Sequence, residues 1–119
     1  MAYTQIPVQT LTTAGVALTW TANDTEATGM KFQNDGNTYL GVLNGNEGAD
    51  AAVVTIISSG TVNGLALANV SKTIAAGDLY QFARLPIDAF NVQSGTDINS
   101  VLITITGDAA ADVSFALIK

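Results

Sequence analysis

Hydrophobic and polar residues alternate along most of this chain with the two-residue period of an extended strand. Residues 101–106 show the pattern most clearly, because Val101, Ile103 and Ile105 share one face and two threonines occupy the other. Residues 112–119 repeat the alternation after a Gly-Asp turn. We therefore expect these two segments to form an antiparallel pair closed by a loop, with the apolar face of each turned inward.

Further strands follow from the same alternation and from the turn residues between segments. The segment 39–44 carries apolar residues on both faces, which predicts a central position in a sheet. An Asn-Asp-Gly-Asn turn separates it from the short strand at 30–32, and Asp-Gly is among the strongest hairpin signals, so these two strands should form a hairpin. The other predicted strands are 5–10, 16–21, 53–57, 65–70, 73–74 and 79–85.

This pattern predicts an all-β fold. About eight short strands, with turns about every ten residues and no amphipathic helix, are typical of a single antiparallel β-sandwich of jelly-roll-like topology. A chain of 119 residues fits one domain, 1–119. Residues 1–13, interrupted by Pro7, are expected to be either an extended N-terminal arm or an ordinary first strand of the same subunit.

Composition and charge exclude several classes of function. The chain has no His and no Cys, the side chains that most often carry acid-base and nucleophilic chemistry at neutral pH. Ten acidic residues against four basic ones give a net charge of −6, which disfavours contact with nucleic acid phosphates. The cations, Lys31, Lys72, Arg84 and Lys119, are scattered, so we expect no basic patch for a membrane surface.

The chain also carries no obvious targeting signal. No apolar run reaches the roughly 18 to 20 residues that cross a bilayer. The first residues lack the charged and apolar regions of a signal peptide. We therefore expect the protein to be made and folded in the cytoplasm.

Only a few acidic residues suggest a site for catalysis or metal binding. Asp24 with Glu26, and Glu47 with Asp50, come nearest to the paired carboxylates of glycoside hydrolysis, and with neighbouring asparagines they resemble oxygen ligands for Ca²⁺. Solvated turns account for the same residues, and the spacing does not match an EF-hand loop. We predict no enzyme activity, no cofactor and no bound metal.

Aromatic residues offer a different binding chemistry. Trp20 together with Tyr3, Tyr39 and Tyr80 would make a platform for stacking against sugar rings. Alternation instead groups Trp20 with the apolar positions of the segment 16–21, which favours burial of its ring in the core.

The layout of several motifs, which together span most of the chain, points to a family. The motifs are Tyr3-Thr4-Gln5-Ile6-Pro7-Val8, Leu11-Thr12-Thr13-Ala14-Gly15-Val16, Lys31-Phe32-Gln33-Asn34-Asp35-Gly36-Asn37-Thr38-Tyr39-Leu40 with Val42 and Asn44, Ile74-Ala75-Ala76-Gly77-Asp78, Leu85-Pro86, Phe90-Asn91 and a hydrophobic C-terminal strand. In this layout the chain resembles the small capsid decoration proteins of tailed bacteriophages, the cement or head-stabilising proteins bound outside an assembled shell.

The resemblance implies a role, a partner and a location. It implies a structural virion protein that decorates and stabilises the outside of a phage capsid by binding the major capsid protein. It further implies a protein made in the host cytoplasm and carried on the capsid exterior, as a small cyclic homo-oligomer with a homotrimer as the first expectation. The family carries no catalytic motif, so the resemblance assigns no catalytic residues.

A protein that binds many equivalent shell sites needs a segment that reaches its neighbours. We expect the extended N-terminal segment to do so by adding a strand to a neighbouring sheet. The residues expected to contact the capsid are Tyr3, Thr4, Gln5, Ile6, Pro7 and Val8. The alternative function is a glycan- or receptor-binding β-module of a phage fibre.

Overall fold

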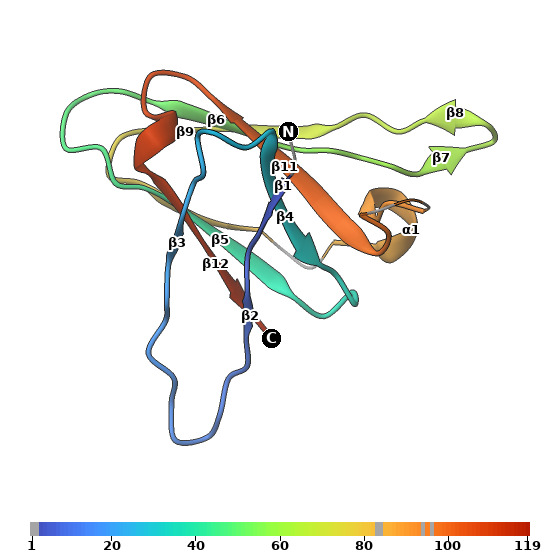
Figure 1. Ribbon diagram of the computed structural model, residues 1–119, viewed down its shortest axis with the longest axis horizontal. Helices are drawn as coiled ribbons and strands as arrows, with labels where there is room; N and C mark the ends of the chain where they lie inside the picture. The colour runs from blue at the N-terminus through green and yellow to red at the C-terminus, as the bar shows by residue number, and fades with distance from the viewer. Residues whose placement is uncertain (1–2, 83–84, 94, 96) are drawn as a thin grey trace.

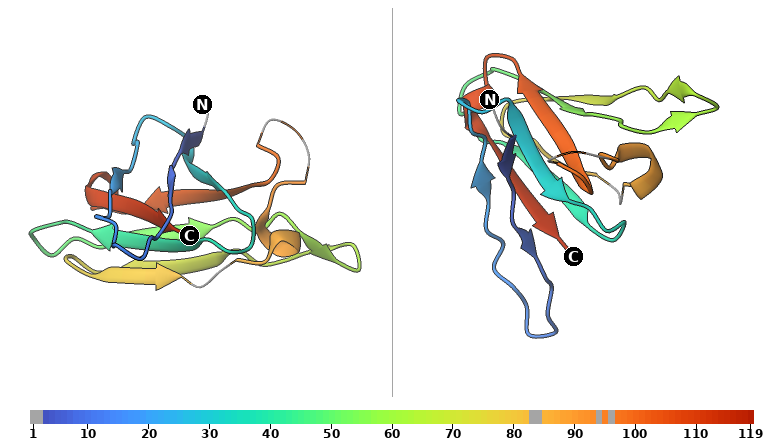
Figure 2. Two further views of the ribbon diagram at one scale, coloured as in Figure 1. Left: turned by 90° about the horizontal axis from the view of Figure 1, so that it is seen from below. Right: turned by 45° about the vertical axis from the view of Figure 1, so that its right-hand side comes forward.

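The alternating segments form two β-sheets that lie face to face, as Figures 1 and 2 show. The computed structural model describes residues 3–82, 85–93, 95 and 97–119. Within these residues the chain forms twelve strands, one short α-helix and one 3-10 helix. The all-β fold is therefore confirmed, while the jelly-roll topology stays a prediction.

Long and short strands both contribute to the sheets. The strands of four or more residues are β4 (Gly29–Gln33), β5 (Tyr39–Asn44), β6 (Ala52–Ile56), β9 (Val70–Ile74), β10 (Leu79–Phe82), β11 (Ser100–Thr106) and β12 (Val113–Ile118). The shorter ones are β1 (Tyr3–Gln5), β2 (Val8–Gln9), β3 (Thr21–Ala22), β7 (Thr61–Val62) and β8 (Leu65–Ala66). Helices α1 (Ile87–Phe90) and η1 (Ala110–Asp112) lie in connections.

The two sheets are mixed rather than purely antiparallel. Sheet A has the order β1-β4-β11-β6-β9, and sheet B has the order β10-β5-β12-β2, with β3 also paired to β12. The pairs β1 with β4 and β2 with β12 are parallel, and the other pairs in sheets A and B are antiparallel. The central position predicted for 39–44 is confirmed, because β5 lies between β10 and β12.

The core lies between the sheets and is built from alternate side chains of each strand. Sheet A contributes Met30, Phe32, Val54, Ile56, Ile74, Val101 and Ile103, and sheet B contributes Leu40, Val42, Val113, Phe115 and Leu117, all at most 1% exposed. Burying a side chain of this size stabilises a fold by about 1.5–3 kcal/mol relative to exposure. These rows of buried side chains, one from each sheet face, therefore hold the two sheets together.

The pairing expected between 101–106 and 112–119 is wrong. The first segment is β11 in sheet A, paired with β4 and β6, whereas the second is β12 in sheet B, paired with β5, β2 and β3. Both segments bury one apolar row, but the rows face each other across the core instead of lying side by side in one sheet. Helix η1 and the turn at Gly107 carry the chain from one sheet to the other.

The hairpin expected around Asp35-Gly36 is wrong for the same reason. Gly36 does adopt the left-handed backbone of a tight turn, with φ of +84°. However, the turn joins β4 in sheet A to β5 in sheet B. Asn34 and Thr38 on either side of it are buried, so the turn folds over the end of the core rather than extending from a sheet. The long hairpin of the structure is β6 with β9, which carries β7 and β8 at its far end.

Three smaller differences concern the ends of elements. The strand predicted over 16–21 is reduced to β3, while residues 16–20 lead to it without pairing as a strand. The strand predicted over 79–85 is β10, which ends at Phe82, and residues 83 and 84 lie outside the described part. Helix α1 follows Pro86 and was not predicted, because four residues are too few to show a helical period.

Replacing Gly29 by alanine should destabilise the fold. A Cβ at Gly29 would lie 2.2 Å from the carbonyl oxygen of Ile103 on the neighbouring strand, so β4 or β11 must move. We expect Gly29→Ala to lower the free energy of unfolding by about 1–3 kcal/mol, measured by urea denaturation.

The matched control is Gly41→Ala, a second strand glycine. A Cβ there meets the Trp20 ring at 3.5 Å, which is an ordinary contact. The expected change in unfolding free energy is below about 1 kcal/mol. Equal losses for the two variants would contradict the close approach of β4 and β11.

Candidate functional site

The segment expected to contact the capsid is built into the two sheets of its own subunit. β1 pairs with β4 at the edge of sheet A, and β2 pairs with β12 in sheet B. Between them Ile6 is fully buried, and its backbone N–H donates to the carbonyl of Lys31 over 2.8 Å. Of the remaining residues, Tyr3 and Thr4 are half-buried, and Gln5, Pro7 and Val8 are exposed.

Of the two alternatives for the N-terminus, the structure favours an ordinary first strand. Ile6 belongs to the core, so residues 3–9 cannot leave the subunit without opening it. Thr4 is tied further by a 2.8 Å hydrogen bond from its hydroxyl to the Asp24 carboxylate. Contact with a capsid through the exposed Gln5, Pro7 and Val8 stays a prediction, and residues 1 and 2 lie outside the described part.

Two other segments project from the sandwich instead. Residues 10–20, here the N-terminal projection, extend below the body in Figure 1, and residues 57–69, the central projection, extend to its right. All of residues 10–19 are exposed. The base of the N-terminal projection is fixed because the Gln9 amide both donates to the Thr19 carbonyl over 2.8 Å and accepts from the Thr19 N–H over 2.7 Å.

Both projections expose apolar side chains. Leu11, Val16 and Leu18 on the N-terminal projection are 56%, 36% and 43% exposed, and Leu65 on the central projection is 73% exposed. The central projection is held by the pairing of β7 with β8 and by the Asn69 side chain, which accepts from the Ser58 N–H over 2.9 Å. Ordered extensions that end in exposed apolar groups are suited to contact with neighbouring molecules.

Acidic residues gather at the end of the sandwich opposite the N-terminal projection. The loops β5–β6, β9–β10 and β11–β12 meet there, as the hydrogen bonds from Asn44 N to Asp78 O and from Gly45 N to Asp112 O show. The β3–β4 loop joins them through the hydrogen bond from Asn23 Nδ2 to Ala110 O. These loops carry seven of the ten carboxylates, namely Asp24, Glu26, Glu47, Asp50, Asp78, Asp108 and Asp112, and no Lys or Arg. We call this region the acidic end.

Several polar side chains of the acidic end are engaged by hydrogen bonds within the protein. The pKa of Asp24 is lowered, first by the hydrogen bond from Thr4 and then by the N–H of Glu26, so its carboxyl is unsuited to act as a general acid. The Asn46 side-chain oxygen accepts from the Gly48 N–H over 2.8 Å, and Asn44 is fully buried. In the described part of the chain, no group of three or more His, Cys, Asp or Glu side chains is placed to hold a metal ion.

The four aromatic residues do not form one platform. Tyr3 packs against the position of Gly29 on sheet A, and Tyr80 packs against the core with the Lys72 ammonium 4.7 Å from its ring centre. Trp20 is half-buried on the outer face of sheet B, so its expected place in the core is wrong. Of the three tyrosines, Tyr39 lies on the same outer face as Trp20. Leu40 and Val42, on either side of Gly41, are buried in the core, so the alternation of the strand turns Tyr39 and Gly41 outward.

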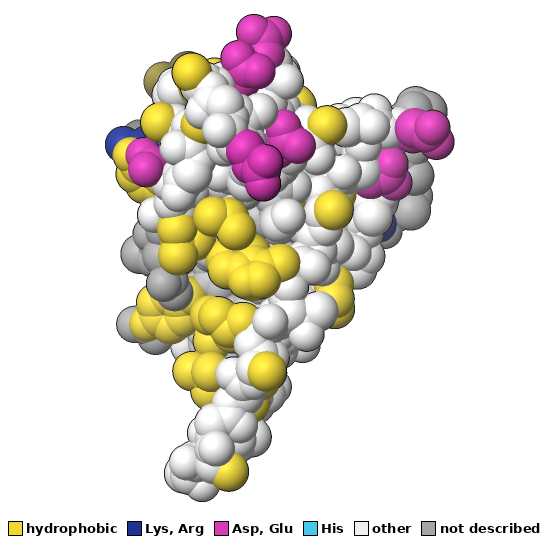
Figure 3. Space-filling model, turned by 90° about the vertical axis from the view of Figure 1, so that its left-hand side faces the viewer, with side chains coloured by type: hydrophobic (Ala, Val, Ile, Leu, Met, Phe, Trp, Pro, Cys, Tyr) yellow, Lys and Arg dark blue, Asp and Glu magenta, His cyan; other side chains and the backbone are white. Residues whose placement is uncertain are grey.

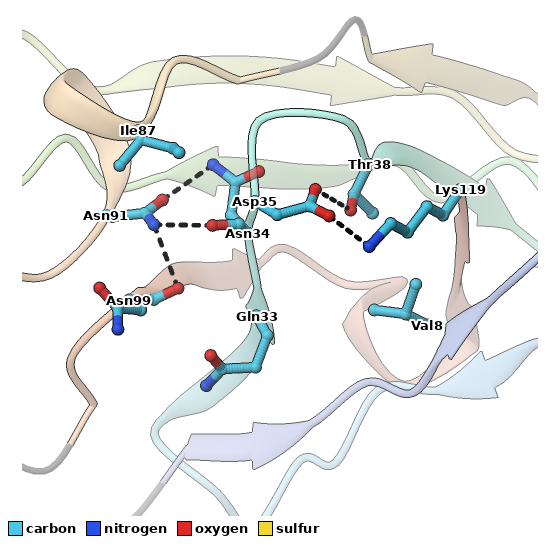
Figure 4. Close-up of a pocket in the computed structure, with 9 residues that line it drawn as sticks. All are labelled: Val8, Gln33, Asn34, Asp35, Thr38, Ile87, Asn91, Asn99 and Lys119. Carbon is cyan, nitrogen blue, oxygen red and sulfur yellow. Dashed lines mark hydrogen bonds and ion pairs between the residues drawn. The ribbon is translucent and has the colours of Figure 1, made fainter.

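A hollow of about 440 Å³ opens at the other end of the sandwich, where β4 ends and β5 begins (Figure 4). It is lined by Val8, Gln33, Asn34, Asp35, Thr38, Ile87, Asn91, Asn99 and Lys119. Sequence reasoning did not find it, since its amides come from segments far apart in the chain. Two of them, Asn34 and Asn91, are buried.

The buried amides of this hollow bind each other and the backbone. Asn34 donates to the Asn91 side-chain oxygen over 2.8 Å and to the Leu85 carbonyl over 3.0 Å. Asn91 donates to the carbonyls of Asn34 and Asn99 over 2.9 Å and 3.2 Å. Because these donors are already used, the network holds the loops together and leaves little hydrogen-bonding capacity for a ligand.

The one carboxylate in the hollow is paired. Asp35 forms an ion pair with Lys119 at the end of β12. The hydrogen bond from Lys119, followed by that from the Asn37 N–H, lowers the pKa of Asp35 to about 2. Asp35 is therefore ionised at neutral pH and cannot serve there as a general acid.

Replacing Asn91 by aspartate should destabilise the protein. A carboxylate can accept from Asn34 but cannot donate to the two carbonyls, and it places a charge in a buried site. We expect Asn91→Asp to reduce the free energy of unfolding by about 2–4 kcal/mol in urea titrations. Asn69→Asp makes the same chemical change at an exposed position, where the side-chain oxygen accepts from the Ser58 N–H and a carboxylate can do the same, so it should have little effect; a comparable loss there would rule out the network as the cause.

The Asp35–Lys119 pair should contribute to stability in a pH-dependent way. The folded-state pKa of Asp35 lies below its ordinary value of 3.8, so its stabilisation is complete above about pH 4. It is lost as the pH falls toward 2. Thermal unfolding of wild type and Asp35→Asn should therefore differ above pH 4 and converge near pH 2, by a small amount because the pair is exposed.

The control for this experiment is Glu47→Gln, an exposed carboxylate without an ion pair in the described residues. Its difference from wild type should change little over the same range. A difference for Asp35→Asn that persists at pH 2 would show that the effect does not come from the ion pair.

Comparison with known proteins leaves the family open. No family model matches the chain, and neither a curated protein nor a solved structure matches it. Among the described residues, no helix has the length and apolar character needed to cross a membrane.

Proposed function

We propose that this chain is a structural virion protein that decorates and stabilises the outside of a phage capsid by binding the major capsid protein. The observation that carries the proposal is the pair of projections, residues 10–20 and 57–69, which leave a two-sheet body and expose Leu11, Val16, Leu18 and Leu65. A protein that fastens subunits of a shell must reach several neighbours at once, and projections on a firm body do so.

The body supports the same role. A cement protein must transmit force between capsid subunits without deforming, and a packed two-sheet core has low compressibility. Charged residues make up only 12% of the chain, so much of the surface is neutral and suited to contact with protein. Most of the motifs that resemble decoration proteins lie in the strands and connections of this body, and the motif from Leu11 to Val16 lies in the N-terminal projection.

The arrangement suggests an orientation on the shell. The N-terminal projection and the exposed residues Pro7 and Val8 lie away from the acidic end. With the projection against the capsid, the seven carboxylates of the acidic end would face solution, where their hydration is retained. We further propose that the protein is a homo-oligomer, with a trimer as the first expectation, made in the host cytoplasm and carried on the capsid exterior.

A second candidate function is a glycan- or receptor-binding module of a phage fibre. Its support is the position of Trp20 and Tyr39 on one outer face, since aromatic rings exposed on a sheet stack against sugars. Trp20 is the only tryptophan, so its emission reports this face directly. A shift in emission on adding host glycans would favour this function, and unchanged emission would count against it.

The decoration role is tested by co-sedimentation with undecorated heads of the source phage. Wild type should saturate the heads at a copy number that is a multiple of the lattice symmetry. The double variant Val16→Ser, Leu18→Ser should bind at least about tenfold more weakly, because it removes two exposed apolar groups from the N-terminal projection.

The control is Val70→Ser, Ile98→Ser, which removes two apolar groups of similar exposure, 40% and 46%, outside both projections. It should bind as wild type does. Failure of the wild-type chain to bind heads would overturn the proposed function, and equal binding by all three proteins would exclude the N-terminal projection as the contact.

A further inference from the structure

The outer faces of the two sheets differ in chemistry. On sheet A, the hydroxyl residues Thr104, Thr55 and Ser71 lie side by side across β11, β6 and β9, and the last two share a 3.0 Å hydrogen bond. On sheet B, Leu79 lies beside Leu43, and Tyr39 lies beside Ile118. The outer face of sheet A is mixed, because Leu102 and Val53 lie beside Lys31 and Thr106 on it, whereas the outer face of sheet B is predominantly apolar.

The chain covers only the middle of the outer face of sheet B. The Trp20 ring lies over Gly41, 3.5 Å from where a Cβ would stand. Ala116, the outward-facing cross-strand partner of Gly41, is 1% exposed. On either side of this covered centre, Leu79 is 59% exposed and Tyr39 is 39% exposed, while Leu43 and Ile118 are half-buried.

This face carries no charge among its described side chains. Its members are Trp20, Tyr39, Leu43, Leu79, Ser114, Ala116 and Ile118, which we call the outer face. In Figure 3 the acidic side chains lie in the upper part of the molecule, above the apolar side chains that gather below them. A chain of net charge −6 thus keeps one broad surface free of carboxylates.

We propose that the outer face is covered by a second copy of this chain. The charge distribution favours this occupant, because two copies that each carry −6 repel least where neither presents a carboxylate. A charged partner would instead find its complement at the acidic end. The outer face is thus the surface through which copies of the chain would form the proposed homo-oligomer. Only the place of that oligomer on a capsid rests on the proposed function.

A stable contact takes a substantial part of the surface of a chain of this size. A standard protein interface removes about 800 Å² from each partner, roughly an eighth of the 6487 Å² surface of this chain. The outer face spans three strands and adjoins the N-terminal projection. Trp20 lies at its centre and Tyr39 at its side, and tryptophan and tyrosine are enriched among the residues that dominate binding energy.

The test is sedimentation velocity of the purified full chain over about 1 to 200 µM, a range in which mass action populates weak oligomers. Wild type should associate, and Leu79→Lys should weaken association at least about tenfold, because it places a charge in the contact. Leu65→Lys makes the same change at a more exposed site on the central projection and should associate as wild type does. Circular dichroism confirms that each variant is folded.

Two further readouts identify the surface. Acrylamide quenching of Trp20 should decrease as the oligomer forms, because the second copy shields the ring. Raising the salt concentration from about 0.05 to 0.5 M should leave association unchanged or strengthen it, since salt screens the repulsion between acidic ends and does not weaken apolar contact.

Three outcomes would overturn the inference. They are a chain that stays monomeric throughout the range, an oligomer that Leu65→Lys weakens as much as Leu79→Lys, and an oligomer in which Trp20 quenching is unchanged. A monomer whose binding to heads is lost in Leu79→Lys would assign the face to the capsid instead. Self-association without head binding would leave this inference standing and remove the proposed function.

Discussion

The structure depends on the burial of one apolar row from each strand between two sheets. A row such as Val101 and Ile103 is stable only when another row covers it, here the row that contains Phe115. A chain with short connections meets this requirement by sending successive strands to opposite sheets, as β4 and β5 or β11 and β12 do. The turns at Gly36 and Gly107 therefore cross the core instead of closing hairpins.

Buried asparagines stabilise both ends of this core. At one end Asn34 and Asn91 join loops that are 57 residues apart in the chain. At the other end Asn44 donates to the carbonyls of Asp50 and Ile74 over 3.1 Å and 2.9 Å. Each amide satisfies backbone groups that strand pairing leaves free, so the loops are held by the body. This fixed arrangement keeps the acidic end separate from the outer face.

The surface of the protein is consequently divided by chemistry. Seven carboxylates gather at one end, polar and apolar side chains share the outer face of sheet A, apolar side chains predominate on the outer face of sheet B, and both projections expose apolar side chains. The hydrogen bond from Lys119 helps to hold the pKa of Asp35 at about 2, so this carboxylate is ionised at neutral pH. This division leaves apolar groups available for contact with neighbouring molecules and carboxylates in contact with solvent.

The sequence by itself determined the all-β class and most strand positions, because alternation such as that of 101–106 reveals which side chains turn inward. It identified β5 as central from its two apolar faces. The tertiary structure alone decided which sheet each strand joins, that residues 3–9 pair within the subunit, and that Trp20 lies outside the core over Gly41. Alternation shows that a row must be covered, but contacts between segments far apart in the chain decide what covers it.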